Sequence, residues 1–274
     1  MTLRFSEIAI GVATALFVAS ASWAGPAACG TDTPGVYNPD AKKFFLKDTQ
    51  ASGKADHIFK YTVGAATEQV LYGDWDGDGK DTQGIYNPTA KKFFLKDTLA
   101  AGAADHIFKF TVGAATEEVV VGDWDGDGKD TVGIYNPTAK KFFLKNTLAA
   151  GAADTIFKYT VGAATEEIHT GNWDGIDGDT VGIYNPAAKK FFLRDSLSAG
   201  PANHIYKYTV GAATETILTG DWDADCDDTP AIYNPAARKW FLKNTHSAGK
   251  ADTIFKYQIG AATEEPSTGN WNGI

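Results

Sequence analysis

A repeat of 49 residues governs the chain after residue 30. The marker Gly-Asp-Trp or Gly-Asn-Trp begins at five positions, each 49 residues after the last: Gly73, Gly122, Gly171, Gly220 and Gly269. Ile274 falls in the slot that Asp78 occupies in its own repeat, and Gly30 falls in the next slot, that of Gly79. Residues 30–274 therefore make five whole periods whose two ends adjoin in phase. We expect a closed ring, in which the two ends meet.

One copy of the repeat reads as four short strands. Within residues 118–164, β-branched and aromatic runs cover residues 119–124, 131–135, 140–147 and 156–161. Segments rich in Gly, Asp, Asn, Pro or Ala separate these runs at a spacing of roughly ten residues, which is typical of all-β folds. Apart from the first residues of the chain, no run has a helical period.

The last two strands of each repeat carry apolar residues on both faces. Phe142 and Leu144 point to one side of their strand and Phe143 to the other, since successive side chains alternate. A sheet that is apolar on both faces must be covered on both, and sheets covered by copies of themselves are propeller blades. The sequence thus predicts an all-β, five-bladed β-propeller with four antiparallel strands per blade, one domain over residues 25–274. The alternative is an extended β-solenoid, which needs dissimilar capping repeats at its ends.

The phase of the repeat also predicts how the ring closes. The first repeat opens at the second strand, because Val36 and Tyr37 match Ile134 and Tyr135. The chain finishes with a first strand at residues 267–271. We expect one composite blade in which residues 267–271 pair with residues 34–37, so that N- and C-terminal strands remove two open sheet edges.

Charge and the N-terminal segment point to an exported protein. The chain has 25 Lys and Arg against 34 Asp and Glu, a formal net charge of −9, which argues against nucleic acid as a partner. Residues 1–24 read as a secretory signal peptide, with an apolar stretch at residues 8–20 and small residues before a cleavage site after Ala24. A retained N-terminal anchor is the alternative. We expect a secreted, periplasmic or cell-surface protein with no membrane insertion after cleavage.

Two cysteines, Cys29 and Cys226, follow the predicted signal. An even number in an exported chain permits one disulfide. The two residues occupy neighbouring slots in loops of adjacent ring positions, but a disulfide requires Cα atoms within about 7 Å. Two free thiols are the alternative.

The loop between the first and second strands carries the strongest chemical signal. Residues 74–82 read Asp-Trp-Asp-Gly-Asp-Gly-Lys-Asp-Thr, and residues 123–131 are identical. Carboxylates at positions 1, 3 and 5 followed by Gly at position 6 are what a tight calcium loop needs. Hard oxygen ligands without His or Cys favour Ca²⁺ over a transition metal. The alternative is that the aspartates only cap a hairpin turn.

At this motif the chain resembles the FG-GAP or VCBS-type repeats, whose signature is Gly-Asp-Phe/Trp-Asx-Gly-Asp-Gly-x-Asp. The resemblance recurs through residues 30–274 and implies a β-propeller that holds Ca²⁺ in these loops. It carries over the ligand residues Asp74, Asp76, Asp78 and Asp81, and Asp123, Asp125, Asp127 and Asp130. The family often has Asp at position 9, where this chain has Thr82 and Thr131, so that Asp81 and Asp130 are the candidates for the last ligand.

The other three loops depart further from the signature. One keeps its carboxylates at Asp221, Asp223, Asp225 and Asp228 but has Cys226 in place of the turn glycine. The next retains Asn172, Asp174 and Asp179 around Ile176, and the closure loop offers Asn270, Asn272 and Asp32. We expect calcium occupancy to fall in this order.

Near-identity of the repeats argues against an enzyme. Residues 73–121 and 122–170 differ at only seven of 49 positions, whereas a five-bladed glycosidase, the least favoured alternative, needs carboxylates in distinct environments. The repeated Trp residues are expected to pack between blades. We expect a non-enzymatic binding or adhesion module for extracellular carbohydrate or a surface protein, with a symmetry similar to the tachylectin family. The other alternative is a structural scaffold that assembles into homo-oligomers.

Overall fold

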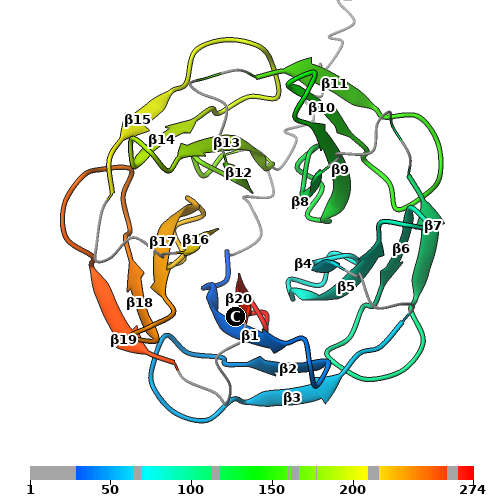
Figure 1. Ribbon diagram of the computed structural model, residues 1–274, viewed down its shortest axis with the longest axis horizontal. Coiled ribbons are helices and arrows are strands. Elements are labelled where there is room, and N and C mark those ends of the chain that lie inside the picture. The colour runs from blue at the N-terminus through cyan, green and yellow to red at the C-terminus, as the bar shows by residue number, and fades with distance from the viewer. Residues whose placement is uncertain are drawn as a thin grey trace, which may run out of the picture.

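The computed structural model describes residues 29–63, 69–110, 112, 118–159, 161, 167–176, 178–208, 216–257 and 265–274. The strands of these residues form five four-stranded antiparallel sheets, arranged as blades around a central axis (Figure 1). The described residues contain no helix. The predicted five-bladed β-propeller is therefore confirmed, while the predicted signal peptide lies outside the described residues.

Each blade runs from an innermost to an outermost strand. Blade 1 contains β20 (Glu265–Gly269), β1 (Thr33–Asn38), β2 (Lys43–Leu46) and β3 (His57–Lys60). Blade 2 contains β4 (Gln69–Gly73), β5 (Thr82–Asn87), β6 (Lys92–Leu95) and β7 (His106–Lys109). Blade 3 contains β8 (Glu118–Gly122), β9 (Thr131–Asn136), β10 (Lys141–Leu144) and β11 (Thr155–Lys158). Blade 4 contains β12 (Glu167–Gly171), β13 (Thr180–Asn185), β14 (Lys190–Leu193) and β15 (His204–Tyr206). Blade 5 contains β16 (Thr216–Gly220), β17 (Thr229–Asn234), β18 (Lys239–Leu242) and β19 (Thr253–Lys256).

Blade 1 is the composite blade that closes the ring. Its innermost strand β20 comes from the end of the chain and pairs antiparallel with β1, with Thr33 opposite Gly269 and Tyr37 opposite Glu265. The hydroxyl of Thr33 also donates to the Gly269 carbonyl at 3.2 Å. The predicted closure is confirmed, and the pairing starts two residues earlier, at Glu265.

The blades pack face to face through large apolar side chains. Leu71, Trp75 and Phe93 of blade 2 form one cluster with Val132 and Ile134 of blade 3. The repeated Trp75 is 2% exposed, and its ring lies so close to Gly84 that a Cβ there would be 3.2 Å from Cζ2. The expectation that these tryptophans pack between blades is confirmed.

The last two strands of each blade differ in part from the expectation. The predicted strands at residues 140–147 and 156–161 are four residues long, as β10 and β11. Phe157 is buried as expected, but Ile156 is 51% exposed. Only one face of the outermost strand is therefore covered. Phe157 lies on the covered face, whereas Ile156 lies on the other face and is exposed to solvent.

Hydrogen bonds join neighbouring blades at both edges. Around the axis, the Thr219 hydroxyl donates to the Thr170 carbonyl at 3.0 Å, and the Thr268 hydroxyl donates to the Thr219 carbonyl at 2.9 Å. Near the outside, the Tyr257 hydroxyl donates to the Phe45 carbonyl at 3.2 Å across the closure. The axial bond occurs at three of the five junctions and the outer bond at four, and they help to fix the relative positions of the sheets.

Candidate functional site

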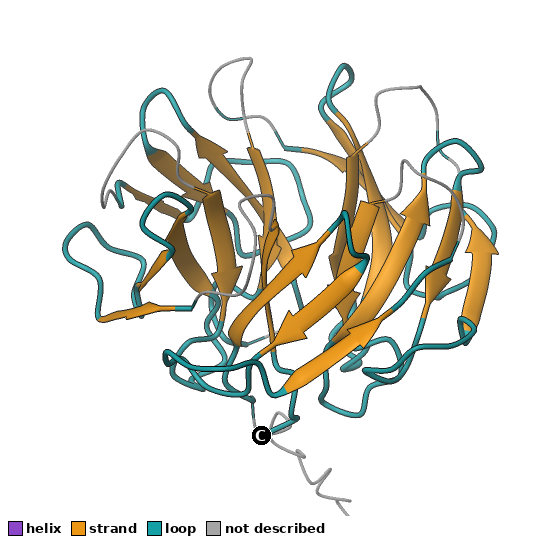
Figure 2. Ribbon diagram, turned by 60° about the horizontal axis from the view of Figure 1, so that its bottom comes forward, coloured by secondary structure: helices purple, strands orange, loops and turns teal. Residues whose placement is uncertain are grey.

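One end of the ring carries the candidate site, and we call it the loop face. In an antiparallel blade, the connection between the first two strands and that between the last two lie at the same end. The loop face thus contains the Asp loops (residues 74–81, 123–130, 172–176 with 178–179, 221–228 and the closure loop of residues 270–274 with 29–32). It also contains the outer loops (residues 47–56, 96–105, 145–154, 194–203 and 243–252). The C-terminus lies at this end, beside the loops (Figure 2).

Three Asp loops bring their first three carboxylates together. In each group the three side chains offer one oxygen apiece, and these oxygens lie within 4.8 Å of one another: Asp74, Asp76 and Asp78; Asp123, Asp125 and Asp127; Asp221, Asp223 and Asp225. Oxygen ligands at 2.3–2.6 Å from one calcium ion are up to about 5 Å apart. The spacing of these triads therefore fits Ca²⁺.

The first aspartate of each triad also shapes its loop. Asp74 Oδ1 accepts the backbone N–H groups of Gly77 and Asp78 at 2.8 and 3.1 Å, and its Oδ2 accepts that of Gly79 at 2.8 Å. Burial raises the pKa of Asp74 from its ordinary value, and these N–H groups act against the rise. A carboxylate has about four lone-pair sites, and three of them accept these N–H groups, so that capping the turn leaves about one site, on Oδ2, for a cation.

The loop of blade 5 keeps this shape without its glycines. Ala224 and Cys226 stand in the slots of Gly77 and Gly79 and adopt positive φ of 61° and 71°. The Cys226 N–H still donates to Asp221 Oδ2 at 2.8 Å. Cys226 is bonded to Cys29, with Cα atoms 5.2 Å apart, which confirms the disulfide. The bond ties the strained loop to the start of blade 1.

The structure places Asp81, Asp130 and Asp228 away from the triads. Together with Asp32 and Asp179 they form a ring around the axis, where they line a cavity of about 160 Å³. Each belongs to one blade and contacts the Asp loop of the preceding blade. Asp130, for example, accepts the Asp74 N–H through Oδ2 at 2.8 Å, and its own N–H donates to the Asp74 carbonyl at 2.7 Å.

This axial ring is a feature that the sequence reasoning missed. Burial raises the pKa of Asp81 and of Asp179 to about 7, and raises those of Asp32, Asp130 and Asp228 well above the ordinary value. Repulsion from other ring carboxylates adds to the rise for Asp130. The signal was present: an aspartate occupies this slot in all five repeats, including those whose triad has decayed.

Clefts open on the loop face where two blades meet. Between blades 1 and 2, a cleft of about 360 Å³ is lined by Trp271 of one blade and by Lys80, Asp97 and Leu99 of the next. Between blades 3 and 4, the equivalent cleft has about 770 Å³ and is lined by Trp124, Asp195 and Leu197 among others. Trp271 and Trp124 share a repeat slot, as do Leu99 and Leu197, so these are two copies of one site.

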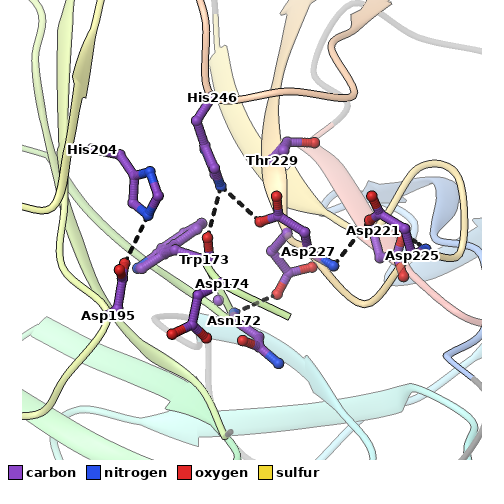
Figure 3. Close-up of polar contacts among 12 residues, drawn as sticks. Asn172, Trp173, Asp174, Asp195, His204, Asp221, Asp225, Asp227, Thr229 and His246 are labelled. Carbon is purple, nitrogen blue, oxygen red and sulfur yellow. Dashed lines mark hydrogen bonds and ion pairs between the residues drawn. The ribbon is translucent and has the colours of Figure 1, made fainter. Parts of the chain in front are cut away.

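Polar side chains occupy the leucine slot at two other junctions. His246 lies there between blades 4 and 5, with Nε2 3.0 Å from the Trp173 carbonyl oxygen and 2.7 Å from Asp227 Oδ1 (Figure 3). Gln50 lies there between blades 5 and 1 and donates to the Trp222 carbonyl at 2.7 Å. Both side chains bond to the tryptophan backbone of the preceding blade, at the place where leucine lines an open cleft.

Three histidines of the outer loops and outermost strands lie beside local polar groups. Two oxygen acceptors face His246 Nε2, which makes this nitrogen a donor, and Nδ1 lies 3.2 Å from the Tyr206 hydroxyl oxygen. His204 Nε2 lies 2.9 Å from Asp195 Oδ1 (Figure 3), and His106 Nε2 lies 2.8 Å from Asp97 Oδ1 in the same repeat slots. Among the described residues, no histidine belongs to a group with metal-ligand spacing.

Comparisons with protein-family models, with curated proteins and with solved structures returned no significant match. Within the described ranges, no helix has the length and apolar character needed to cross a membrane.

Proposed function

We propose that this β-propeller is an exported, non-enzymatic, calcium-stabilised binding module. Its ligand, an extracellular carbohydrate or another surface molecule, binds in the inter-blade clefts of the loop face. The observation that carries this proposal is the recurrence of one cleft between blades 1 and 2 and between blades 3 and 4, built from the same repeat slots.

The chemistry of the clefts suits a polyhydroxylated ligand. Asp97 and Thr98 offer a carboxylate and a hydroxyl beside the apolar surface of Leu99, and a few placed polar groups on an apolar wall are typical of ligand sites. Two weak equivalent sites on one rigid ring also increase avidity without new contacts.

The triads support the calcium part of the proposal. Their spacing fits the ion, and their sequence matches the FG-GAP or VCBS-type signature, whose loops bind it. Asp123, Asp125 and Asp127 also line the cleft between blades 3 and 4. An ion in this triad would hold the wall of the cleft in place. The disulfide supports export, because such bonds persist in oxidising compartments.

A glycan and matrix-polymer binding screen, with calcium and with EDTA, tests the proposal. We expect binding that weakens in EDTA, with more than one ligand per chain by titration calorimetry. An absence of binding to every glycan and polymer, in both conditions, would contradict it.

A structural scaffold is the second candidate, and one observation favours it. Each outermost strand exposes an isoleucine at the same slot, so that five apolar side chains surround the ring at 51–54% exposure: Ile58, Ile107, Ile156, Ile205 and Ile254. Repeated apolar groups at open strand edges are suited to association. High-mass assemblies in light scattering that disappear on Ile→Thr substitution, together with a negative binding screen, would support this candidate.

A further inference from the structure

Each blade carries two lysines at matching positions of its two outermost strands. In blade 1, Lys43 of β2 lies directly opposite Lys60 of β3, and Ile58 lies two residues before Lys60. We call these three residues, and their equivalents in the other blades, a lysine patch. The pairing recurs in three further blades, and the same slots hold lysines in blade 4: Lys92 with Lys109, Lys141 with Lys158, Lys239 with Lys256, and Lys190 with Lys207.

The pairs bring like charges together without a compensating carboxylate. Residues directly opposite each other in an antiparallel pair have Cβ atoms about 5 Å apart, and like charges at such positions are destabilising. None of the ten lysines forms an ion pair with a carboxylate of the described residues. The glutamates of those residues, Glu118, Glu167 and Glu265, begin innermost strands, at the other edge of each sheet. The patches are therefore basic on a chain that is acidic as a whole.

Protection of the sheet edge explains only one lysine of each pair. A lysine on an edge strand opposes edge-to-edge association, and Lys60 on β3 can have this role. Lys43 lies on the next strand inward, which is paired on both sides, so it protects no edge. Its Nζ lies 5.3 Å from the centre of the Phe45 ring, but this contact removes no charge from the pair. The second lysine needs another explanation.

The patches have an apolar part and face around the circumference of the ring. Ile58 shares a face with Lys60, because alternate side chains of a strand point the same way, and it is 53% exposed. Val36 lies on this face too, since it is opposite Phe45, which is opposite Ile58. Val36 packs in one cluster with Trp222 of blade 5. Each patch thus faces the preceding blade, and the five patches point in five directions around the axis (Figure 1).

We propose that the lysine patches bind an acidic polysaccharide. Its carboxylate or sulfate groups lie between the paired lysines, since hydrogen bonds between ionised partners are the strong ones. Its sugar rings lie against the isoleucines, because apolar surface beside a few polar groups is typical of ligand sites. A flat membrane could meet only one or two of the five patches, whereas a flexible chain can follow the rim and engage several. This surface is separate from the clefts of the loop face.

Polymer binding in EDTA tests the proposal, because EDTA removes any calcium that bridges an anionic polymer to the Asp loops. The probes are polygalacturonate for carboxylate, dextran sulfate for sulfate, and neutral dextran. We expect at least one anionic polymer to bind roughly tenfold more tightly than dextran, since a hydrogen bond to a charged group adds about this much. Binding should weaken between about 0.05 and about 0.5 M NaCl, because salt screens exposed charges. Failure of both anionic polymers to bind more tightly than dextran would overturn the proposal, and the tighter of the two identifies the anionic group.

Two pairs of exposed lysines in the same two blades provide matched variants. Lys60→Gln with Lys256→Gln removes one charge from each of two patches, whereas Lys54→Gln with Lys250→Gln removes the same charge from the outer loops of those blades. The first double variant should weaken polymer binding several-fold without lowering the melting temperature, because it relieves repulsion between like charges. The second should leave binding nearly unchanged. Equal losses would show that overall charge holds the polymer, and would overturn the assignment to the patches.

A substitution of the isoleucines tests the contact with the sugar ring. Polyphosphate carries anionic groups without sugar, so Ile58→Thr with Ile254→Thr should weaken binding of the acidic polysaccharide but not of polyphosphate. Both residues are more than half exposed, so the variant should fold like the wild type. An equal effect on both polymers, or no effect on either, would overturn the sugar assignment.

Two further measurements separate other partners of the same surface. Vesicles of phosphatidylglycerol that bind as tightly as the polysaccharide, and lose binding in the Lys60→Gln, Lys256→Gln variant, would identify a membrane surface and overturn the proposal. Weaker binding of vesicles supports it. Light scattering at low salt tests whether the acidic loop face of a second copy is the partner. A mass that rises with concentration for the wild type, but not for this variant, would overturn the proposal, and a constant mass supports it.

Discussion

The Asp130 carboxylate accepts a hydrogen bond from the backbone N–H of Asp74 at 2.8 Å, across the boundary between blades 3 and 2. Four equivalent bonds link the other blades: Asp32 to Asp221, Asp81 to Asn270, Asp179 to Asp123 and Asp228 to Asn172. The axial aspartates thus hold the ring together while crowding five carboxylates around one cavity.

Two substitutions of Asp130 distinguish its role as a hydrogen-bond acceptor from the repulsion that its charge causes. Asp130→Ala should lower the free energy of unfolding by about 1–3 kcal/mol, because the partly buried Asp74 N–H loses its acceptor. Asp130→Asn keeps an oxygen acceptor and removes one repelling charge, so it should be at least as stable as the wild type at pH 8. Urea unfolding followed by tryptophan fluorescence measures both. Equal losses for Ala and Asn would contradict the argument.

The axial ring also predicts an unusual dependence of stability on pH. The pKa values of Asp81 and Asp179 are about 7 in the fold, against an ordinary value near 3.8. The folded state therefore binds more protons than the unfolded state between pH 4 and 7, and the free energy of unfolding should rise as the pH falls from 8 to 5. The lowered pKa values of Asp56, Asp105 and Asp252 act only below pH 4. Melting in EDTA at each pH checks this, and a melting temperature that falls from pH 8 to 5 would contradict it.

Much of the fold could be predicted from the repeat itself. The phase of Gly30 and Ile274 predicted the pairing of β20 with β1, because strand order in a ring follows from where the repeat is cut. The exposure of Ile156 could not be predicted in this way. An apolar residue on an outermost strand has the same sequence pattern as one on a covered strand, and only the position of the strand in the sheet distinguishes them.

The candidate site was predictable in part for a similar reason. Asp74, Asp76 and Asp78 converge within one loop, so that local spacing sufficed to group them. Asp81 follows them in sequence and was grouped with them, but its side chain bonds to Asn270 of the neighbouring blade. The close packing of Gly178 was equally hidden, because the atom that a Cβ there would meet, at 2.1 Å, is the Asp123 carbonyl oxygen of another blade.

His169 should be a point of weakness in acid. Burial lowers its pKa to about 4, and its shielded Nε2 has no partner among the described residues. The unfolded state therefore binds a proton that the folded state does not between pH 6.5 and 4, and this contribution falls as the pH falls, opposite to that of the axial ring. Leu71 and Leu218 occupy the same repeat slot. His169→Leu should stabilise the protein by about 1–2 kcal/mol more at pH 5 than at pH 8. Urea unfolding at both pH values measures the difference, and an equal gain at both would show that proton binding is not the cause.

The disulfide should stabilise the ring strongly, because Cys29 and Cys226 are 197 residues apart. For a loop of this length the chain-entropy relation gives about 5 kcal/mol. The double variant Cys29→Ser, Cys226→Ser should melt well below the wild type. Replacing Cys226 by Gly in place of Ser should recover about 1 kcal/mol, since the positive φ of this residue suits glycine. No difference between the Ser and Gly variants would mean that the loop changes shape once the bond is lost.

Calcium should raise the melting temperature through the triads. An ion that binds only the folded state adds about 2.7 kcal/mol per site at 100 times its dissociation constant, and extracellular modules bind in the range of about 0.1–1 mM. Differential scanning fluorimetry should therefore show a rise in 10 mM CaCl₂ over EDTA. Asp123→Ala combined with Asp125→Ala should reduce this rise, because the triad loses two ligands. The control is Asp174→Ala, in the loop where Ile176 already replaces a ligand; it should leave the rise unchanged. A wild-type melt that is the same in calcium and in EDTA would leave the triad aspartates only their observed role, which is to cap the turns of the Asp loops.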